Sequence, residues 1–173
     1  APALEGEKEF SLFERNFVRP TLDVHGIMGG FTDEGSKTVI PAKATAKLSM
    51  RLVPDQDPDT IAALLEKHIQ RLVTPGTRVK LRRLGEGSWP VLLDISHPGI
   101  GAATRAFEAS FGQKPFLVRA GYSIPVVADF AAALPGSHIF VTGFAAEEDA
   151  PHSPNERMVL DNFHRGTEMV IHL

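Results

Sequence analysis

Ala42-Lys43-Ala44-Thr45-Ala46-Lys47-Leu48-Ser49-Met50-Arg51-Leu52 is the stretch that decides the fold of this chain. Every second residue from Ala42 to Leu52 is apolar, and the residues between them are Lys, Thr, Ser or Arg. Successive side chains of a strand point to opposite faces, so this period of two predicts a β-strand with one buried and one polar face. Arg51 lies on the polar face, at the end of the strand.

The segments on both sides of this strand extend the pattern. Residues 21–25 predict another strand, which ends in a glycine-rich turn at 26–30. After the strand, Asp57 caps a predicted helix with Pro58 at its first position. Its apolar stripe runs from Ile61 to Leu72 and contains His68, which we interpret as a core or interface residue.

A third strand is predicted over 77–84, because apolar and polar residues alternate there. The block 20–84 then has the pattern of an open α+β sandwich with one helical face. The turn-rich residues 85–98 indicate a boundary.

Beyond this boundary, short helical and extended segments alternate, which predicts a mostly parallel layered sheet and places the chain in the α/β class. The predicted elements are a helix over 100–111, a strand over 116–119, a tight turn at 120–122, a helix capped by Ser123, a strand over 138–141 and a final helix.

Composition excludes several kinds of function. The chain has 173 residues and a net charge of -3, so nothing in its charge favours a nucleic-acid or anionic-membrane partner. No apolar run approaches the roughly 18 residues that span a bilayer. The absence of cysteine excludes disulfides and thiolate metal ligands, and is compatible with the cytoplasmic location that we expect.

The stretch Ala150-Pro151-His152-Ser153-Pro154-Asn155-Glu156 contains the strongest candidate for chemistry. Ser153 and Glu156 have the spacing of a capping box, and Pro154 falls at the first position of the helix that this box predicts. His152 then stands just before a helix N-terminus, where a neutral imidazole can bind a metal or a substrate. The alternative is a surface histidine beside a cap.

Other candidates have ordinary alternatives too. Ser123 caps a helix or helps that helix N-terminus to bind an anionic ligand group. Arg51 is a solvated strand-end residue or a clamp for a carboxylate. Thr38 begins an extended segment, and the acids Glu147, Glu148 and Asp149 are solvated, or act as ligands or a general base. No local motif assembles a complete metal site.

Taken together, six stretches resemble the carnosinase-like branch of the di-zinc aminoacylase and dipeptidase family of metallopeptidases. They follow one another in the order expected of that family and cover nearly the whole chain. The stretches are residues 19–27 (RPTLDVHGI), 37–41 (KTVIP), 51–54 (RLVP), 96–98 (SHP), 119–126 (RAGYSIPV) and 150–156 (APHSPNE).

The resemblance implies a domain organisation. Residues 1–95 match the latter part of a ferredoxin-like lid, or dimerisation, domain, and residues 96–173 match the closing part of a phosphorylase/hydrolase-like catalytic layer. Family members also have a longer upstream portion, which carries an HxD pair, adjacent glutamates and a further acid. Those residues are absent here, so we expect a chain that is incomplete and inactive by itself.

The resemblance also implies roles for individual residues. His152 matches a metal ligand, Arg51 and Thr38 match lid residues that bind the substrate's carboxylate and its surroundings, and Ser123 matches the substrate-binding turn. Tyr122 departs from the family, which usually has glycine at that position. The cofactor that the resemblance implies is a pair of divalent ions, zinc in this family, that activate a shared water for amide hydrolysis.

We therefore expect the C-terminal portion of a cytoplasmic peptidase that forms a homodimer through its lid and acts on small peptides, without nucleic-acid or membrane partners. A deacylase or desuccinylase acting on N-acyl amino acids is the enzymatic alternative, since Arg51 suits any free carboxylate. A non-catalytic dimerisation module, in which His152 has no role, is the alternative outside enzymes.

Overall fold

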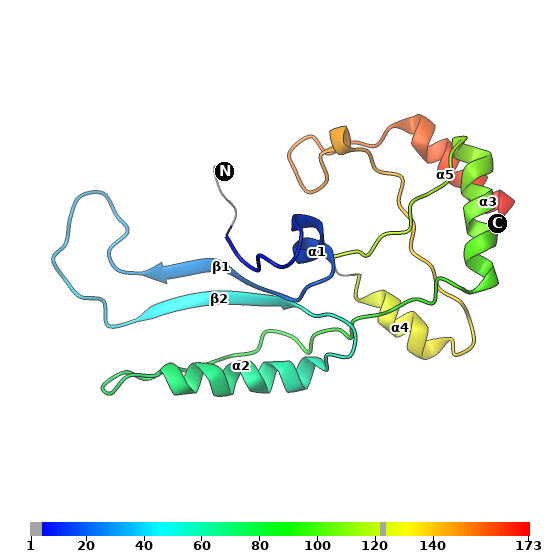
Figure 1. Ribbon diagram of the computed structural model, residues 1–173. Helices are drawn as coiled ribbons and strands as arrows, with labels where there is room; N and C mark the ends of the chain where they lie inside the picture. Colours follow the sequence, from blue (N-terminus) through cyan, green and yellow to red (C-terminus); the bar gives the residue numbers. More distant parts are fainter. Residues whose placement is uncertain (1–4, 122–123) are drawn as a thin grey trace. The chain divides into compact units, whose positions relative to one another are not determined.

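The computed structural model describes residues 5–121 and 124–173, and Figure 1 shows the order of their helices and strands. The chain divides into two compact units. The first runs up to Val91 and also contains Arg119–Ala128, and the second contains Leu92–Val118 and Asp129–Leu173.

A two-stranded antiparallel sheet organises the first unit. Strand β1 (Thr21–Gly29) pairs with β2 (Ala44–Arg51), so that Thr21 lies opposite Arg51 at one end and Gly29 lies opposite Ala44 at the other. The expected turn at 26–30 is wrong, because β1 continues through Gly26 and stays paired to Gly29. A bulge between Val24 and Gly26 accommodates the additional residue.

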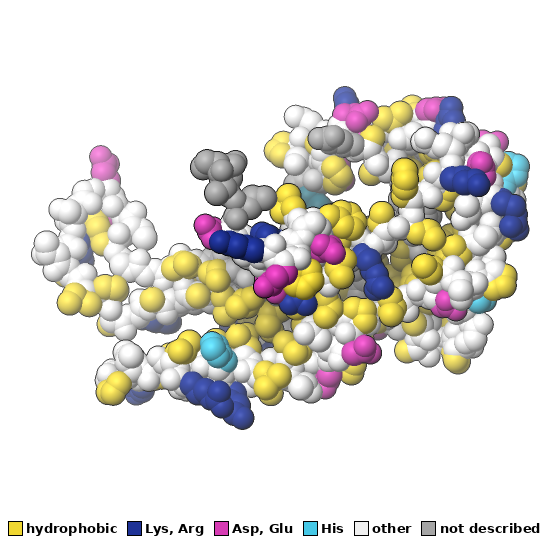
Figure 2. Space-filling model, viewed as in Figure 1, with side chains coloured by type: hydrophobic (Ala, Val, Ile, Leu, Met, Phe, Trp, Pro, Cys, Tyr) yellow, Lys and Arg dark blue, Asp and Glu magenta, His cyan; other side chains and the backbone are white. Residues whose placement is uncertain are grey.

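The apolar face of this hairpin is not buried. Leu22 is 55% exposed and Leu48 is 37% exposed, and Figure 2 shows hydrophobic side chains at the surface over the strands. The predicted half-buried strand is therefore confirmed as a strand but not in its burial. Two strands alone have no second layer to cover one face, and such hairpins are marginally stable.

Helix α1 (Leu12–Phe17) precedes the hairpin and begins with a complete capping box. The Ser11 hydroxyl accepts from the Glu14 N–H, and the Glu14 carboxylate accepts from the Ser11 N–H at 2.8 Å. The Ser11 hydroxyl also donates to the Glu14 carboxylate at 2.7 Å, and this bond, together with the one from the Ser11 N–H, lowers the pKa of Glu14. Just after the helix, Arg19 donates two hydrogen bonds to Glu7, which lowers the pKa of that carboxyl.

Helix α2 (Pro58–Leu72) confirms the prediction made from its cap. The Asp57 carboxylate accepts from the Asp59 N–H at 3.0 Å and from the Thr60 hydroxyl at 2.7 Å. His68 is exposed, so its interpretation as a core residue is wrong for this structure. The strand predicted over 77–84 is also absent, since the sheet of the described ranges contains β1 and β2 alone.

Two packed helices form the core of the second unit. Helix α3 (Pro98–Phe111), as predicted, lies against α5 (Leu160–His172), and Ala106 and Met169 are almost completely buried. The chain between them contributes Phe144, whose ring stacks on Phe111 at 5.5 Å between centroids. The remaining helical segments are α4 (Val126–Ala133) and the 3₁₀ turn η1 (Glu147–Asp149).

The expected parallel sheet does not form in the part of the chain that the structure describes. Residues 116–119 and 138–141 have no strand pairing, so both predicted strands are wrong here. The mixed α/β composition is confirmed, whereas the ferredoxin-like lid and the catalytic layer stay predictions. Among the described helices, none combines the length and apolarity needed to cross a membrane.

Candidate functional site

The loop that carries His152 consists of two consecutive turns. The Ser153 N–H donates to the Ala150 carbonyl at 3.1 Å, and the Glu156 N–H donates to the Ser153 carbonyl at 3.2 Å. Each turn has proline as its second residue, and its third residue has positive φ, +62° at His152 and +63° at Asn155. This combination of proline and a left-handed third residue is typical of type II turns.

The predicted capping box is therefore wrong. Pro154 is the second residue of a turn and not the first residue of a helix, and α5 begins six residues later, at Leu160, without a side-chain cap. The two residues of the expected capping box, Ser153 and Glu156, make other hydrogen bonds. Ser153 contributes its backbone, and the Glu156 carboxylate accepts from the N–H of His152 at 3.2 Å.

His152 is exposed at the third position of the first turn. Left-handed backbone is rare for residues with a Cβ, although histidine enters it more often than most, and it costs about 1 kcal/mol or more. Strain of this kind is often found at functional positions. The loop therefore presents this imidazole to solvent at an energetic cost.

The side chains around His152 decide whether this loop can hold a metal ion. An exposed imidazole suits zinc as one ligand, but a protein site needs three or four. No group of three or more His, Asp or Glu side chains that could hold an ion occurs within residues 5–121 and 124–173. His152 therefore fits as a single ligand, and these residues do not complete a centre.

Arg51 lies at the other candidate site, at the end of the hairpin in the first unit. A cavity of about 50 Å³ opens beside it, where the end of α1, the start of β1, the end of β2 and the segment 120–121 converge. Its lining residues are Asn16, Phe17, Arg19, Arg51, Leu52, Val53, Ala120 and Gly121. Arg51 and the residues that lead into the Ser123 turn therefore share one small cavity.

Gly121 makes this convergence possible. A Cβ on Gly121 would overlap the carbonyl oxygen of Asn16 and would lie 3.0 Å from the Cα of Phe17. Both obstacles are backbone atoms and cannot rotate away as a side chain can. Only glycine allows the 120–121 segment to approach the end of α1 this closely.

The other predicted site residues lie elsewhere or cannot be placed. Thr38 is exposed in the connection between β1 and β2, at the Gly29–Ala44 end of the hairpin. The eight residues of β2 span about 23 Å, so Thr38 and Arg51 lie at opposite ends and are not brought together. Ser123 and Tyr122 lie outside the described residues.

Sequence reasoning missed two residues that organise these sites. Gly121 is needed because of a contact that no sequence pattern reveals, since Asn16 lies more than a hundred positions away. Asp149 was grouped with its acidic neighbours as solvated or catalytic, but it is only 2% exposed. No local sequence signal distinguishes it, because alanine at 146 is not a residue that begins a capping box, and the burial of Asp149 depends on the folded chain.

Residues 2–77 match the model of a peptidase dimerisation domain. The chain is 34% identical over 154 residues to the Cys-Gly metallodipeptidase dug1 of Schizosaccharomyces pombe, covering 87% of this chain and 32% of that protein. It is 30% identical over 152 residues to the human Beta-Ala-His dipeptidase, covering 87% and 30%.

Solved structures agree in fold. The M20 family metallo-carboxypeptidase Sso-CP2 from Sulfolobus solfataricus superposes with a TM-score of 0.80 at 27% identity, over 92% of this chain and 36% of that one. The dipeptidase Dug1p of Saccharomyces cerevisiae gives 0.72 at 29% identity, over 93% and 34%. The resemblance is confirmed, and the chain spans about a third of the length of these relatives.

Proposed function

Because this chain is homologous to M20 metallopeptidases, we propose that it is the C-terminal portion of a metal-dependent peptidase that hydrolyses dipeptides or similar small amides. The observation that carries the proposal is similarity to metallodipeptidases along about nine-tenths of the chain. We assign residues 1–95 to a lid that joins two copies into a homodimer, and residues 96–173 to the catalytic domain.

In this proposal His152 contributes one ligand to a centre of two zinc ions. The remaining ligands and the general base belong to a portion of the protein outside this chain. Bound metal lowers the pKa of a water molecule and polarises the amide carbonyl. His152 contributes its imidazole from the third position of the turn, where the residue is exposed and its backbone is left-handed.

Arg51 binds the carboxylate of the substrate. A guanidinium forms two parallel hydrogen bonds with a carboxylate, which fixes orientation as well as charge. Ala120 and Gly121, which precede Ser123 in the chain, line the cavity beside Arg51, and this supports a carboxylate clamp that acts together with the substrate turn. Thr38 stays a candidate, but a dipeptide spans only about 7 Å and cannot contact both Thr38 and Arg51 of one chain.

The first test separates the chain from the complete enzyme. The purified 173-residue chain should show no dipeptide hydrolysis that a chelator inhibits, since one histidine cannot hold the two ions. The protein extended by its upstream portion should show that activity, and His152→Ala should lower its zinc content, measured by atomic emission. Chelator-sensitive turnover by the chain alone, or unchanged zinc in the variant, would contradict the proposal.

A second arm of the test addresses the substrate. Dipeptides and N-acetyl amino acids share a free carboxylate, so a panel of both identifies a dipeptidase or the alternative deacylase. Arg51→Met in the extended protein should lower kcat/KM by about 10–100-fold for either class. C-terminally amidated dipeptides, which lack the carboxylate, should be equally poor substrates of both proteins. Unchanged kinetics in the variant would exclude the clamp.

A further inference from the structure

Asp149 is the most deeply buried charged residue among those that the structure describes, and its surroundings are unusual. Its Oδ2 accepts from the Ala146 N–H at 2.8 Å, while its own N–H donates to the Ala146 carbonyl at 3.1 Å. The side-chain bond is the one that the acid of a capping box makes to the backbone three residues earlier, and the backbone bond closes the 3₁₀ turn η1. Asp149 therefore fixes the beginning of the loop.

Arg157 closes the same loop from its other end. The N–H of Arg157 donates to the Asp149 carbonyl at 3.0 Å, and its Nε donates to the Glu148 carbonyl at 3.1 Å. Two consecutive carbonyls are thus satisfied by one residue. The chain between Asp149 and Arg157 is a closed loop, and His152 stands within it.

The hydrogen bonds of Asp149 and Arg157, which close the two ends of the loop on each other, explain how the loop keeps its backbone conformation. Ala150, His152 and Asn155 have φ of +50°, +62° and +63°, and an open loop would relax at least the first two toward negative φ. A conformation of this kind persists only where surrounding contacts hold it. The contacts available here are the bonds of Asp149 and Arg157 and the two turns between them.

The beginning of the loop, at η1, is also connected to the core that α3 and α5 form. Phe144 lies two residues before Ala146, and its carbonyl accepts from the Asn162 side chain at 3.0 Å. Its ring lies so close to α5 that a Cβ on Gly166 would be 2.6 Å from it. Movement of η1 is therefore resisted by α5, and Asp149 links His152 to a rigid element.

We propose that Asp149 is the positioning residue that holds His152 in its left-handed, outward conformation, with Arg157 as the closing residue of the same loop. The role in metal binding rests on the proposed function, whereas the role in loop geometry does not. Asp149 acts through the backbone and is not itself a ligand. Its second oxygen, Oδ1, is buried and has no hydrogen-bond partner, so the described bonds use only one carboxylate oxygen.

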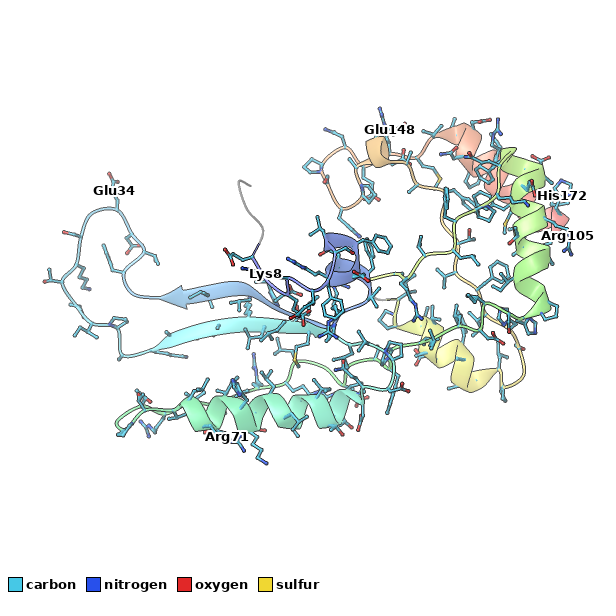
Figure 3. All side chains as sticks on the ribbon, viewed as in Figure 1. Lys8, Glu34, Arg71, Arg105, Glu148 and His172 are labelled. Atoms are coloured by element: carbon cyan, nitrogen blue, oxygen red, sulfur yellow. The ribbon has the colours of Figure 1, made fainter. Side chains whose placement is uncertain are left out.

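Because Oδ1 has no partner, the hydrogen-bond acceptor at position 149 can be tested separately from the negative charge of its carboxylate. An asparagine at 149 keeps an oxygen for the Ala146 N–H and removes a negative charge that is buried without a second partner. Asp149→Asn should therefore preserve the loop, whereas Asp149→Ala should open it. Glu148→Ala is the matched control, because Glu148 is the neighbouring acid, is exposed and points away from the turn (Figure 3).

Amide hydrogen exchange of the 173-residue chain, followed by NMR, tests the proposal directly. In Asp149→Ala the amides of Ala146, Ser153 and Arg157 should exchange at least tenfold faster, while those in the middle of α3 stay unchanged. Asp149→Asn and Glu148→Ala should exchange like the original. Equal exchange at these amides in Asp149→Ala would overturn the proposal, as would an Asp149→Asn variant as open as Asp149→Ala.

If Asp149→Ala unfolds the whole second unit, Arg157→Met gives the same information, since it removes only the Nε donor and should speed exchange locally. In the extended protein, Asp149→Ala should weaken zinc affinity by about 10–100-fold, and Asp149→Asn should restore it. An open loop with unchanged zinc affinity would contradict the link to the metal and leave the geometric role in place. Zinc binding that is insensitive to His152→Ala would instead contradict the proposed function.

Discussion

The end of the hairpin that carries Arg51 and the loop that carries His152 are held in place by different physical means. Arg51 is the last residue of a paired strand, so the ladder between β1 and β2 sets its position. His152 lies in no helix or strand, and two turns with strained backbone hold it through a closed base. A candidate residue at the end of a paired strand is thus positioned by a whole ladder of backbone hydrogen bonds, whereas one in a loop depends on a few individual bonds.

The largest expected effect concerns packing at the Arg51 end. Gly121→Ala places a Cβ against backbone atoms of Asn16 and Phe17, which cannot move without displacing α1. Overpacking of this kind costs about 3 kcal/mol, which lowers the melting temperature by roughly 10 °C. Thermal unfolding followed by circular dichroism measures the change.

Gly85→Ala is the matched control for this substitution. It lies in the same unit, and nothing is within 4 Å of its added Cβ. Its melting temperature should stay within about 2 °C of the original, because surface substitutions of this kind cost little. If Gly121→Ala and Gly85→Ala had the same melting temperature, the close approach of 120–121 to α1 would not exist in solution.

These two regions also differ in how much of them the sequence predicts. The helix that starts at Pro58 was predicted correctly with its cap, because Asp57 and the helix it caps are neighbours in the chain. The strands predicted over 116–119 and 138–141 were not found, because pairing depends on distant partners and alternation alone does not supply one. The need for glycine at position 121 could not be predicted for the same reason, since it comes from a contact with Asn16, which is distant in the sequence.

The error at His152 has a different physical origin. Proline fixes φ near −65°, which suits both the first residue of a helix and the second residue of a turn. Pro151 and Pro154 therefore fit either structure, and Ser153 with Glu156 favoured the helical one. What decides between them is the closure by Arg157 and the burial of Asp149, and both require the folded chain.

The next effect, of intermediate size, concerns strain in the His152 loop. Glycine adopts positive φ without penalty, whereas alanine keeps the Cβ that opposes it. His152→Gly should therefore be more stable than His152→Ala by about 1 kcal/mol in urea denaturation followed by circular dichroism. The pair Ser153→Gly and Ser153→Ala is the control, because Ser153 does not have positive φ and glycine there should be the less stable. Equal stability of the two variants at 152 would show that the loop is relaxed.

The smallest expected effect concerns the acid dependence of stability at a helix N-terminus. The helices of the two regions begin differently, since Asp57 caps α2 and α5 has no side-chain cap. Hydrogen bonds from the Thr60 hydroxyl and the Asp59 N–H hold the pKa of Asp57 below its ordinary value of 3.8. A carboxyl with a lowered pKa in the folded state stabilises the protein fully above its ordinary pKa, and this contribution is lost as the pH falls through the folded value.

Asp57→Asn keeps the cap but does not titrate, so its melting temperature should fall less steeply than that of the original chain below about pH 4. Melting curves recorded from neutral pH down to about pH 2.5 should diverge only at the acidic end. Asp55→Asn removes a neighbouring carboxylate that caps no helix, and it should leave the acid dependence as it is. Parallel curves for Asp57→Asn and the original chain would mean that this cap does not contribute to acid sensitivity, and that the start of α2 is held by packing in the way that the Arg51 end is.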